Sequence, residues 1–239
     1  YNREVEIFPV LNTIFEKIYG ESPYKSPTDM GVNMAGNCIC DDEACREASK
    51  QEIIRRYFDA LNALAKGSTS EKEAQKIELL MNMAGITVTD RKVVIKALER
   101  AKETDGPAAA LELRDGRIIT GKTTNLLGAS AALLLNVLKV LAGIDHETHI
   151  ISPESIEPIQ KLKVDYLKSK NPRLHTDEVL IALSASAATN PQARLALSQL
   201  PELAGCQAHT SVMLSDVDIK IFKKLEVQLT SEAVYEHAL

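Results

Sequence analysis

The sequence predicts an α/β protein, with an N-terminal helical subdomain at residues 1–105 followed by a layered α/β subdomain at residues 106–239. Up to residue 105, apolar residues recur with helical spacing between polar breaks, which is typical of amphipathic helices. From Pro107 onward, short apolar runs alternate with helical segments, which favours a sheet covered by helices. The length of 239 residues also favours two packed units.

The first subdomain is expected to be helical throughout. Its first helix begins near Pro9, because proline suits the first turn of a helix, and Gly20 lies just past its end. Residues 21–37 hold closely spaced prolines and glycines and are expected to form a loop. Further helices are expected at about residues 41–66, 70–84 and 89–102.

The second subdomain is expected to open with a compact hairpin, because Asp115 and Gly116 form a turn signal between apolar runs. The hairpin strands are expected at residues 110–113 and 118–120, and further strands near 148–151, 208–214 and 227–229. Helices are expected at about 126–141 and 153–167, from 176, from 191, and at 216–224. Lys139 inside the apolar segment at 126–141 favours a buried helix over a membrane span.

Composition excludes several classes of function. The net charge is −5, and no basic run is long enough to follow a phosphate backbone, so nucleic acid is not an expected partner. Four unevenly spaced cysteines favour a reducing compartment, which predicts a cytoplasmic protein. Because polar residues interrupt the most apolar segment, at 126–144, no membrane is expected as a partner. Because the chain begins at Tyr1 without a leader, we expect it to be a fragment of a longer protein.

A phosphate-loop pattern occurs at Gly116, Gly121, Lys122 and Thr123, which satisfy G-x-x-x-x-G-K-[ST]. Such a loop needs flexible backbone between its glycines, whereas the two isoleucines at 118–119 favour a strand. We therefore expect a hairpin here that leads into a helix. Lys122 remains a candidate to bind an anionic group.

Polar residues with turn-forming character gather at Thr28, Asp29 and Asn33 in the expected loop. Loops often carry functional residues, so Asp29 is a candidate acid or base and Thr28 and Asn33 are candidates to bind substrate. Turn formation by Asp and Asn explains the same residues equally well.

A second candidate segment, Asn171–His175, leads into a helix for which Thr176 is the expected N-cap. Arg173 and His175 could bind an anion at this N-terminus, and His175 could titrate near neutral pH. A capping network with a structural histidine is the alternative. If both polar segments serve one function, Thr28–Asn33 and Asn171–His175 should line one cleft.

Cys38, Cys40 and Cys45 supply at most three thiolates, whereas structural zinc takes four nitrogen or sulfur ligands. Cys206 or His209 could complete the set only through a contact that the fold would have to create. We therefore expect no metal at these cysteines. The sequence assigns no cofactor.

Four segments resemble the bacterial domain-of-unknown-function family 1846. They are Tyr1–Leu11, Gly20–Met34, Ala48–Tyr57 and Asn171–His175. The resemblance implies full-length members of roughly twice this size, with an N-terminal nucleotide-binding-like half that this chain lacks. It also implies that the chain is the C-terminal portion, and it carries over no catalytic residue.

The expected order of hairpin, helix, strand and helix is similar to the cytidine-deaminase-like layered fold. Deaminases hold zinc with His or Cys at the starts of two core helices, beside a glutamate that moves the proton. This sequence has Thr123–Asn125 and Pro153–Ser155 at those places. The similarity thus implies at most a shared scaffold without its zinc ligands.

The leading hypothesis is the C-terminal part of a cytosolic bacterial enzyme that acts on a small polar substrate, phosphorylated or nucleotide-like in type. The catalytic candidates are Asp29 and His175, and the substrate-binding candidates are Thr28, Asn33, Lys122 and Arg173.

The competing hypothesis is a non-catalytic assembly module of a longer nucleotide-binding-like protein. In it, the helices at 41–66 and 126–141 would bury partner surface. The partner would be a second copy in a homo-oligomer or the N-terminal half of the chain's own full-length protein. Whether the chain is an enzyme is open at this point.

Overall fold

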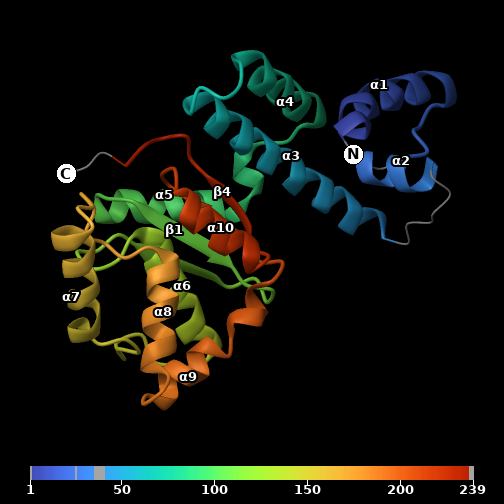
Figure 1. Ribbon diagram of the computed structural model, residues 1–239. Coiled ribbons are helices and arrows are strands. Elements are labelled where there is room, and N and C mark those ends of the chain that lie inside the picture. Colours follow the sequence, from blue (N-terminus) through green and yellow to red (C-terminus); the bar gives the residue numbers. More distant parts are fainter. Residues whose placement is uncertain (1, 25, 35–40, 237–239) are drawn as a thin grey trace. The chain divides into compact units, whose positions relative to one another are not determined.

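The computed structural model describes residues 2–24, 26–34 and 41–236, without the side chains of residues 2–5, 28, 32–34 and 42. The chain divides into two compact units, Tyr1–Arg91 and Lys92–Leu239 (Figure 1). The sequence predicts this division near residue 105. It lies earlier because α5 (Lys92–Thr104) packs on the sheet of the second unit, where Val93 and Ala97 are buried against Ala110.

The described part of the first unit is helical. It contains α1 (Asn2–Tyr19), α2 (Pro27–Met34), α3 (Asp42–Ala65), α4 (Glu71–Ala84) and the 3-10 helix η1 (Val88–Asp90). The Asp41 side chain caps α3 by accepting a hydrogen bond from Ala44 N. Gly85 ends α4 with a φ of 64°, in the left-handed region that glycine adopts without strain. The helices predicted near 41–66 and 70–84 are thereby confirmed.

Two predictions for the first unit are wrong. α1 begins at Asn2 and continues through Pro9, although a proline inside a helix removes one backbone donor. The expected loop contains α2, because Pro27 occupies the first helical position, where no donor is lost, and Ser26 Oγ accepts from Asp29 N at 3.0 Å. The breaker residues at 26–27 therefore start a helix.

The second unit confirms the α/β class. Its strands are β1 (Ala108–Glu112), β2 (Ile118–Lys122), β3 (Gln207–Thr210) and β4 (Gln228–Ser231). Besides α5, its helices are α6 (Ala129–Leu141), α7 (Pro153–Lys161), the π-helix η2 (Leu162–Tyr166), α8 (Thr176–Ser186), α9 (Pro191–Leu197), the 3-10 helix η3 (Leu200–Leu203) and α10 (Asp216–Lys224).

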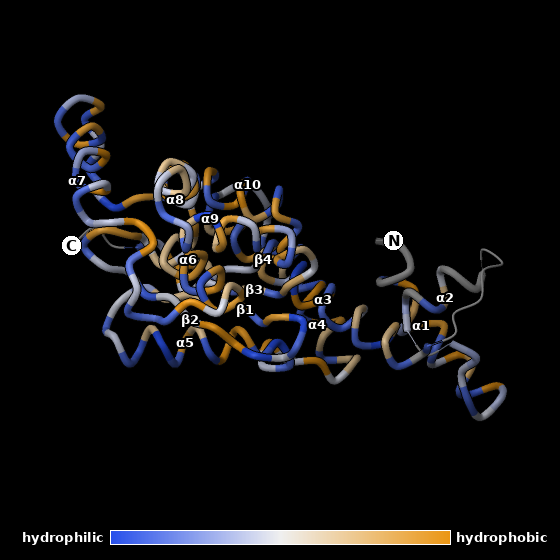
Figure 2. Tube along the Cα trace, turned by 90° about the horizontal axis from the view of Figure 1, so that it is seen from below, coloured by the Kyte–Doolittle hydropathy of each residue, from blue (hydrophilic) through white to orange (hydrophobic). Residues whose placement is uncertain are grey.

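The strands form one mixed sheet in the order β2-β1-β3-β4. β1 runs antiparallel to β2 and β3, and β3 runs parallel to β4. Because side chains alternate along a strand, β1 sends Ala110 toward α5, and Ala109 and Leu111 into the main core. Figure 2 shows α5 on one side of the sheet and α6, α8 and α9 on the other.

Two strand predictions need correction. The strand predicted near 148–151 is absent from the structure, where Ile150 and Ile151 are buried in the core outside any strand. The prediction failed because a short buried apolar run occurs in strands and in packed loops alike. β3 ends at Thr210, short of the predicted Leu214. The predicted helix at 153–167 changes from α-helix to π-helix at Leu162.

The predicted hairpin is confirmed. Gly116 takes a φ of +83° in its turn, and Leu113 N donates to Arg117 O at 2.9 Å. Residues 118–122 are strand β2 and not the flexible loop that the phosphate-loop pattern requires, while the absence of phosphate binding stays a prediction. Gly121 has another role, since a Cβ there would lie 2.2 Å from Leu133 N in α6. The second glycine of the pattern therefore lets a helix pack directly on the strand.

α6 is a core helix of the second unit. Leu133, Leu134, Val137 and Leu138 are all buried in the main core. Within the described residues, no helix is both long and apolar enough to cross a membrane. The helix predicted at 126–141 therefore covers the sheet of its own unit.

Candidate functional site

The C-terminal ends of β3 and β4 lie at the same edge of the sheet, and this edge carries polar groups. The parallel strands end at Thr210 and Ser231. Backbone hydrogen bonds join the segments that follow, from Glu232 N to Thr210 O at 2.9 Å and from Met213 N to Val234 O at 2.8 Å. The carboxyl edge of parallel strands is where α/β proteins usually bind ligands.

The central feature of this edge is a pair of side chains, His175 and Asp218. Asp218 lies in the first turn of α10, and its Oδ2 is 3.0 Å from His175 Nδ1. Its Oδ1 accepts from Thr176 N at 2.9 Å and from Thr176 Oγ1 at 2.8 Å, and Oδ2 accepts from Ser215 Oγ at 2.7 Å. One carboxylate therefore joins the starts of α8 and α10.

The start of α8 differs from the prediction. His175, and not Thr176, occupies the N-cap position, and Glu178 completes a capping box by accepting from His175 N at 2.8 Å. Thr176 is fully buried and directs its hydroxyl to Asp218. The alternative of a capping network is thus part of the structure, but the His175 ring takes part in a further contact.

Asp218 is held as a carboxylate. Burial alone would raise its pKa, but the hydrogen bonds from His175, Thr176 and Ser215 outweigh burial and lower the pKa from 3.8 to about 2. An ionised carboxylate only accepts hydrogen bonds, so His175 Nδ1 is the donor. The hydrogen bond to Asp218 therefore fixes the tautomer of His175 that carries a proton on Nδ1.

The other ring nitrogen of His175 is available. The side chain is 32% exposed, and among the described residues no group hydrogen-bonds to Nε2. The hydrogen bond with Asp218 raises the pKa of His175 above 6.5, against the opposing effect of burial. A histidine oriented through Nδ1, with Nε2 free, can accept or donate a proton near neutral pH.

A buried lysine supports the same helix start. Lys163, in η2, donates from Nζ to Arg173 O at 2.6 Å and to Glu178 Oε2 at 2.8 Å. Glu178 in turn holds the backbone of His175. π-helices are rare and often occur at functional sites. In this chain η2 places a cation against the segment that carries His175.

The two predicted anion-binding residues border the same edge. Lys122 is the last residue of β2 and is exposed. Two residues later, Thr124 O accepts from Arg173 Nε at 3.0 Å, and Arg173 Nη1 pairs with Glu236 Oε1 at 2.7 Å. The structure therefore brings Arg173 to the segment that follows Lys122, with its guanidinium already engaged by a carboxylate.

The other predicted site residues belong to the first unit. Asp29 is 2% exposed, which does not favour direct contact with a substrate. Thr28 and Asn33 lie in α2, and their side chains are outside the described residues. The roles of all three, and their convergence with Asn171–His175 in one cleft, stay predictions.

Metal ligands do not gather in the described part of the chain, where no three His, Cys, Asp or Glu side chains are placed to hold an ion. Cys38 and Cys40 lie outside the described residues. Cys45 and Cys206 are buried free thiols, and burial raises the pKa of Cys206. The expectation of no metal at Cys38, Cys40 and Cys45 stays a prediction.

The His175–Asp218 pair predicts a pH dependence of stability. The raised pKa of His175 stabilises the fold below pH 6.5, and this contribution is lost as pH rises through the folded pKa. The lowered pKa of Asp218 stabilises the fold above pH 3.8 and is lost as pH falls toward about 2. Urea unfolding should give the highest stability between these limits.

In that experiment, His175→Gln should flatten the decline above pH 6.5, while the exposed histidine control His146→Gln should keep it. An unchanged slope in His175→Gln would assign the decline to other groups.

Sequence reasoning found His175 but missed Asp218, Ser215 and Lys163. A local signal existed, because Ser215 and Asp218 have capping-box spacing before an apolar helix. That signal predicts the start of α10 only. It contains no information on a contact between residues 43 positions apart.

Comparison with known proteins gives two matching family models. "Domain of unknown function DUF1846, N-terminal" matches residues 1–85, and "Domain of unknown function DUF1846, C-terminal" matches residues 89–239. The expectation that the chain holds only a C-terminal portion is therefore wrong, because its helical part matches the N-terminal model. The resemblance seen in the sequence is otherwise confirmed at the level of the family.

Curated relatives named UPF0371 protein are similar over almost the whole chain. The relative from Corynebacterium urealyticum is 58% identical over 235 residues, 98% of this chain and 47% of its own length. That from Corynebacterium efficiens is 57% identical over 236 residues, 99% and 48%. That from Streptococcus thermophilus is 52% identical over 237 residues, also 99% and 48%. The chain spans about half the length of these relatives.

Proposed function

This chain belongs to the DUF1846 family, and from that premise we propose that it is part of an enzyme acting on a small polar substrate, phosphorylated or nucleotide-like in type. His175 is the proposed acid or base, and Asp218 is its positioning residue. The observation that carries the proposal is the 3.0 Å contact from His175 Nδ1 to Asp218, which leaves Nε2 without a protein partner among the described residues.

The residues around the pair support a substrate with an anionic group. Lys122 and Arg173 border the segment at Thr124 beside the same sheet edge. An anionic substrate that displaces Glu236 from Arg173 would gain a bidentate partner.

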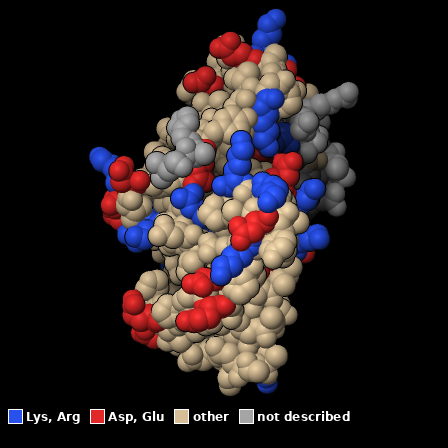
Figure 3. All heavy atoms as spheres, turned by 60° about the vertical axis from the view of Figure 1, so that its left-hand side comes forward, with Lys and Arg blue, Asp and Glu red and all other residues tan. Residues whose placement is uncertain are grey.

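Charge on the surface supports a small ligand over a polymer. On the face shown in Figure 3, Lys and Arg are interspersed with Asp and Glu. A nucleic-acid site instead needs basic side chains gathered on one face. This face therefore does not favour a nucleic-acid partner. We also keep, as proposals from the sequence, that no membrane is the partner and that the protein is cytoplasmic.

The sheet supports a finer proposal for the fold. The order β2-β1-β3-β4, with β1 antiparallel to both neighbours, is compatible with the deaminase-like layered scaffold inferred from the sequence. Thr123–Asn125 and Pro153–Ser155 contribute no His or Cys to hold zinc. We propose a related scaffold with a different chemistry.

The test is a thermal-shift screen of nucleotides and sugar phosphates, with each stabilising compound then followed for turnover. His175→Gln should reduce turnover by about 100-fold or more, the usual contribution of a general acid or base, while the compound still stabilises the protein. The glutamine amide can still donate to Asp218, so the helix start is kept. His146→Gln, at an exposed histidine, is the matched control.

Two results would contradict the proposal. One is a screen in which no nucleotide or sugar phosphate raises the melting temperature. The other is turnover in His175→Gln equal to that of the unmodified chain.

A specific observation favours the second hypothesis, an assembly module. α1 exposes Ile7, Val10, Ile14 and Ile18 at helical spacing, with side chains between 43% and 64% exposed. α6, by contrast, is occupied by the core of its own unit. In this alternative α1 binds a second copy or another part of a longer chain. The molecular mass in solution should then depend on protein concentration, and the thermal-shift screen should find no ligand.

A further inference from the structure

A segment that follows β4 borders the candidate site, and we call its residues 232–236 the strap. Its first residue, Glu232, donates from N to Thr210 O at 2.9 Å, so it continues the pairing of β4 with β3. Met213 N then donates to Val234 O at 2.8 Å. These backbone hydrogen bonds fix the base of the strap on the segment that follows β3.

Both ends of the strap carry a carboxylate that meets a basic side chain. At the base, Glu232 Oε1 lies 3.3 Å from Nε2 of His209, which is fully buried. At the tip, Glu236 Oε1 accepts from Arg173 Nη1 at 2.7 Å, across 63 positions of sequence. The Arg173 and Glu236 side chains are 25% and 34% exposed. A ligand from solution can therefore reach the tip contact, whereas the base contact has a fully buried partner.

The tip carboxylate leaves part of the Arg173 guanidinium unused. Arg173 Nε donates to Thr124 O at 3.0 Å, and Nη1 donates to Glu236. Among the described residues, no acceptor contacts Nη2. A guanidinium can donate two parallel hydrogen bonds to one carboxylate or phosphate group. A phosphate group that accepts from Nη1 and Nη2 together would therefore bind more strongly than Glu236 does.

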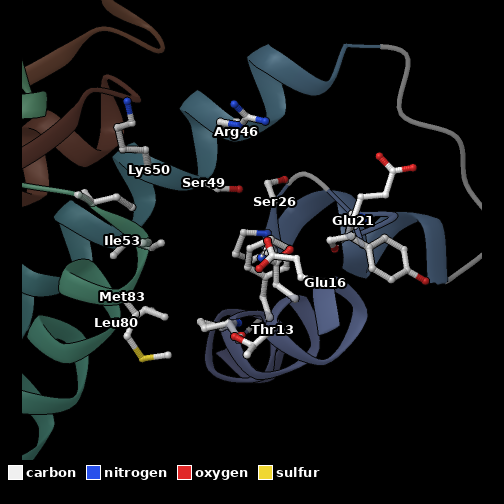
Figure 4. A pocket seen from close by; sticks show the side chains of 18 of the residues that line it. Thr13, Glu16, Glu21, Ser26, Arg46, Ser49, Lys50, Ile53, Leu80 and Met83 are labelled. Atoms are coloured by element: carbon white, nitrogen blue, oxygen red, sulfur yellow. Dashed lines mark hydrogen bonds between the residues drawn. The ribbon is translucent and has the colours of Figure 1, made fainter. Parts of the chain in front are cut away.

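A basic pair in the first unit is engaged differently. Arg46 and Lys50 line a cavity of about 840 Å³, but they pair with Glu43, Glu47 and Asp90, none of which lines it. The Lys50 ammonium also points away from this cavity (Figure 4). A ligand in the cavity would therefore have no reason to displace these carboxylates. The tip of the strap, by contrast, holds its carboxylate at the group that an anionic ligand would use.

We propose that the strap is an internal competitor for anion binding at Arg173. The Glu236 carboxylate occupies the guanidinium until a phosphate or pyrophosphate group of a ligand displaces it. This inference rests on the proposed function, which assigns Arg173 to the anionic group of the substrate. The base of the strap stays in place during the exchange, because its hydrogen bonds end at Val234, and residues 235–236 move.

The tethered carboxylate sets a threshold for binding. Because the fixed base keeps Glu236 near Arg173, its effective concentration is about millimolar, as for other short tethers. The affinity of every anion that needs the guanidinium is reduced by the fraction of molecules in which Glu236 has left it. Weak anions therefore stay unbound, while a group that uses both terminal nitrogens of Arg173 exceeds the threshold.

Calorimetric titration of the 239-residue chain with inorganic pyrophosphate tests this competition. Glu236→Gln should lower the Kd about two- to fivefold, the range for a partly exposed ion pair, because the amide is not an anionic competitor. Glu202→Gln is the matched control. Glu202 is exposed in η3, before the end of β3 opposite Thr210, and its charge there is screened by salt. This variant should leave the Kd unchanged.

A double variant separates competition from general charge repulsion. Arg173→Gln should weaken pyrophosphate binding, because it removes the guanidinium. In that background Glu236→Gln should have no further effect on the Kd, because the strap has no cation to occupy. Thermal melting shows whether each variant is folded. The comparison of Glu236→Gln with the unmodified chain decides the proposal by itself if Arg173→Gln does not fold.

Tighter binding by Glu236→Gln that Arg173→Gln removes supports the competition. Equal Kd values for Glu236→Gln and the unmodified chain overturn it, and so does an equal gain in the Arg173→Gln background. It is also overturned if Glu236→Gln does not bind pyrophosphate at about millimolar concentration, the weak end of specific affinities. These titrations do not depend on turnover, so the strap and the role of His175 as acid or base can fail separately.

Discussion

Replacing Gly121 with alanine is expected to lower the free energy of unfolding by about 3 kcal/mol or more. The new Cβ would lie 2.2 Å from Leu133 N and 2.5 Å from Leu133 Cα, and both are backbone atoms that no rotamer change can move. α6 cannot shift easily, because its side chains are buried in the main core. Urea unfolding of the two proteins measures the loss.

Gly128→Ala is the matched control for this change. Gly128 has a φ of −68°, and the nearest atom to its added Cβ would be Leu174 O at 3.8 Å. Its stability should change by less than about 1 kcal/mol, in either direction. A loss below about 1 kcal/mol in Gly121→Ala would mean that the contact between β2 and α6 is loose. Such a result would remove the packing explanation for this glycine.

The second large effect is expected for Asp218→Ala, which should cost about 3–5 kcal/mol of stability. The change removes the acceptor of His175 Nδ1, Thr176 N, Thr176 Oγ1 and Ser215 Oγ. Thr176 is fully buried, so its donors cannot turn to water. Thermal and urea unfolding report the loss, and the pH dependence of stability above pH 6.5 should decrease as well.

Two further variants separate charge from hydrogen bonding. Asp218→Asn keeps an acceptor for Thr176 but loses the negative charge beside His175, so it should cost less than the alanine change. Asp177→Ala, in the first turn of α8, removes one local hydrogen bond and should cost about 1 kcal/mol or less. Equal losses in Asp218→Ala and Asp177→Ala would show that Asp218 is an ordinary helix-start carboxylate.

Only some elements of the fold have a local signal in the sequence that is sufficient to predict them. The hairpin at Asp115 and Gly116 was predictable, because a turn signal between apolar runs has a local cause, and the loop holds the three residues 114–116. α2 was not, because Ser26 and Pro27 signal a loop and a helix start equally well. Ile150 and Ile151 were misassigned because burial, and not strand pairing, selects apolar residues there.

The candidate site shows the limit of local signals more sharply. The segment Asn171–His175 predicts a helix start, and His175 could be identified from it as a candidate site residue. Asp218 and Lys163 could not be assigned to the site, because the fold brings them to His175 from other helices. The grouping of a site depends on tertiary packing, which single-sequence periodicity does not contain.

The carboxylate shared by α8 and α10 also constrains how this sequence can vary. A substitution at Asp218 alters two helix starts at once, so a tolerated change would need simultaneous replacements near Thr176 and Ser215. Positions 175, 176, 215 and 218 should therefore vary as a linked set among relatives, and single exchanges within the set should be rare. In evolutionary terms, the Asp218 carboxylate, which would orient His175 for proton transfer, also makes the effect of a substitution at one of these positions depend on the residues at the others.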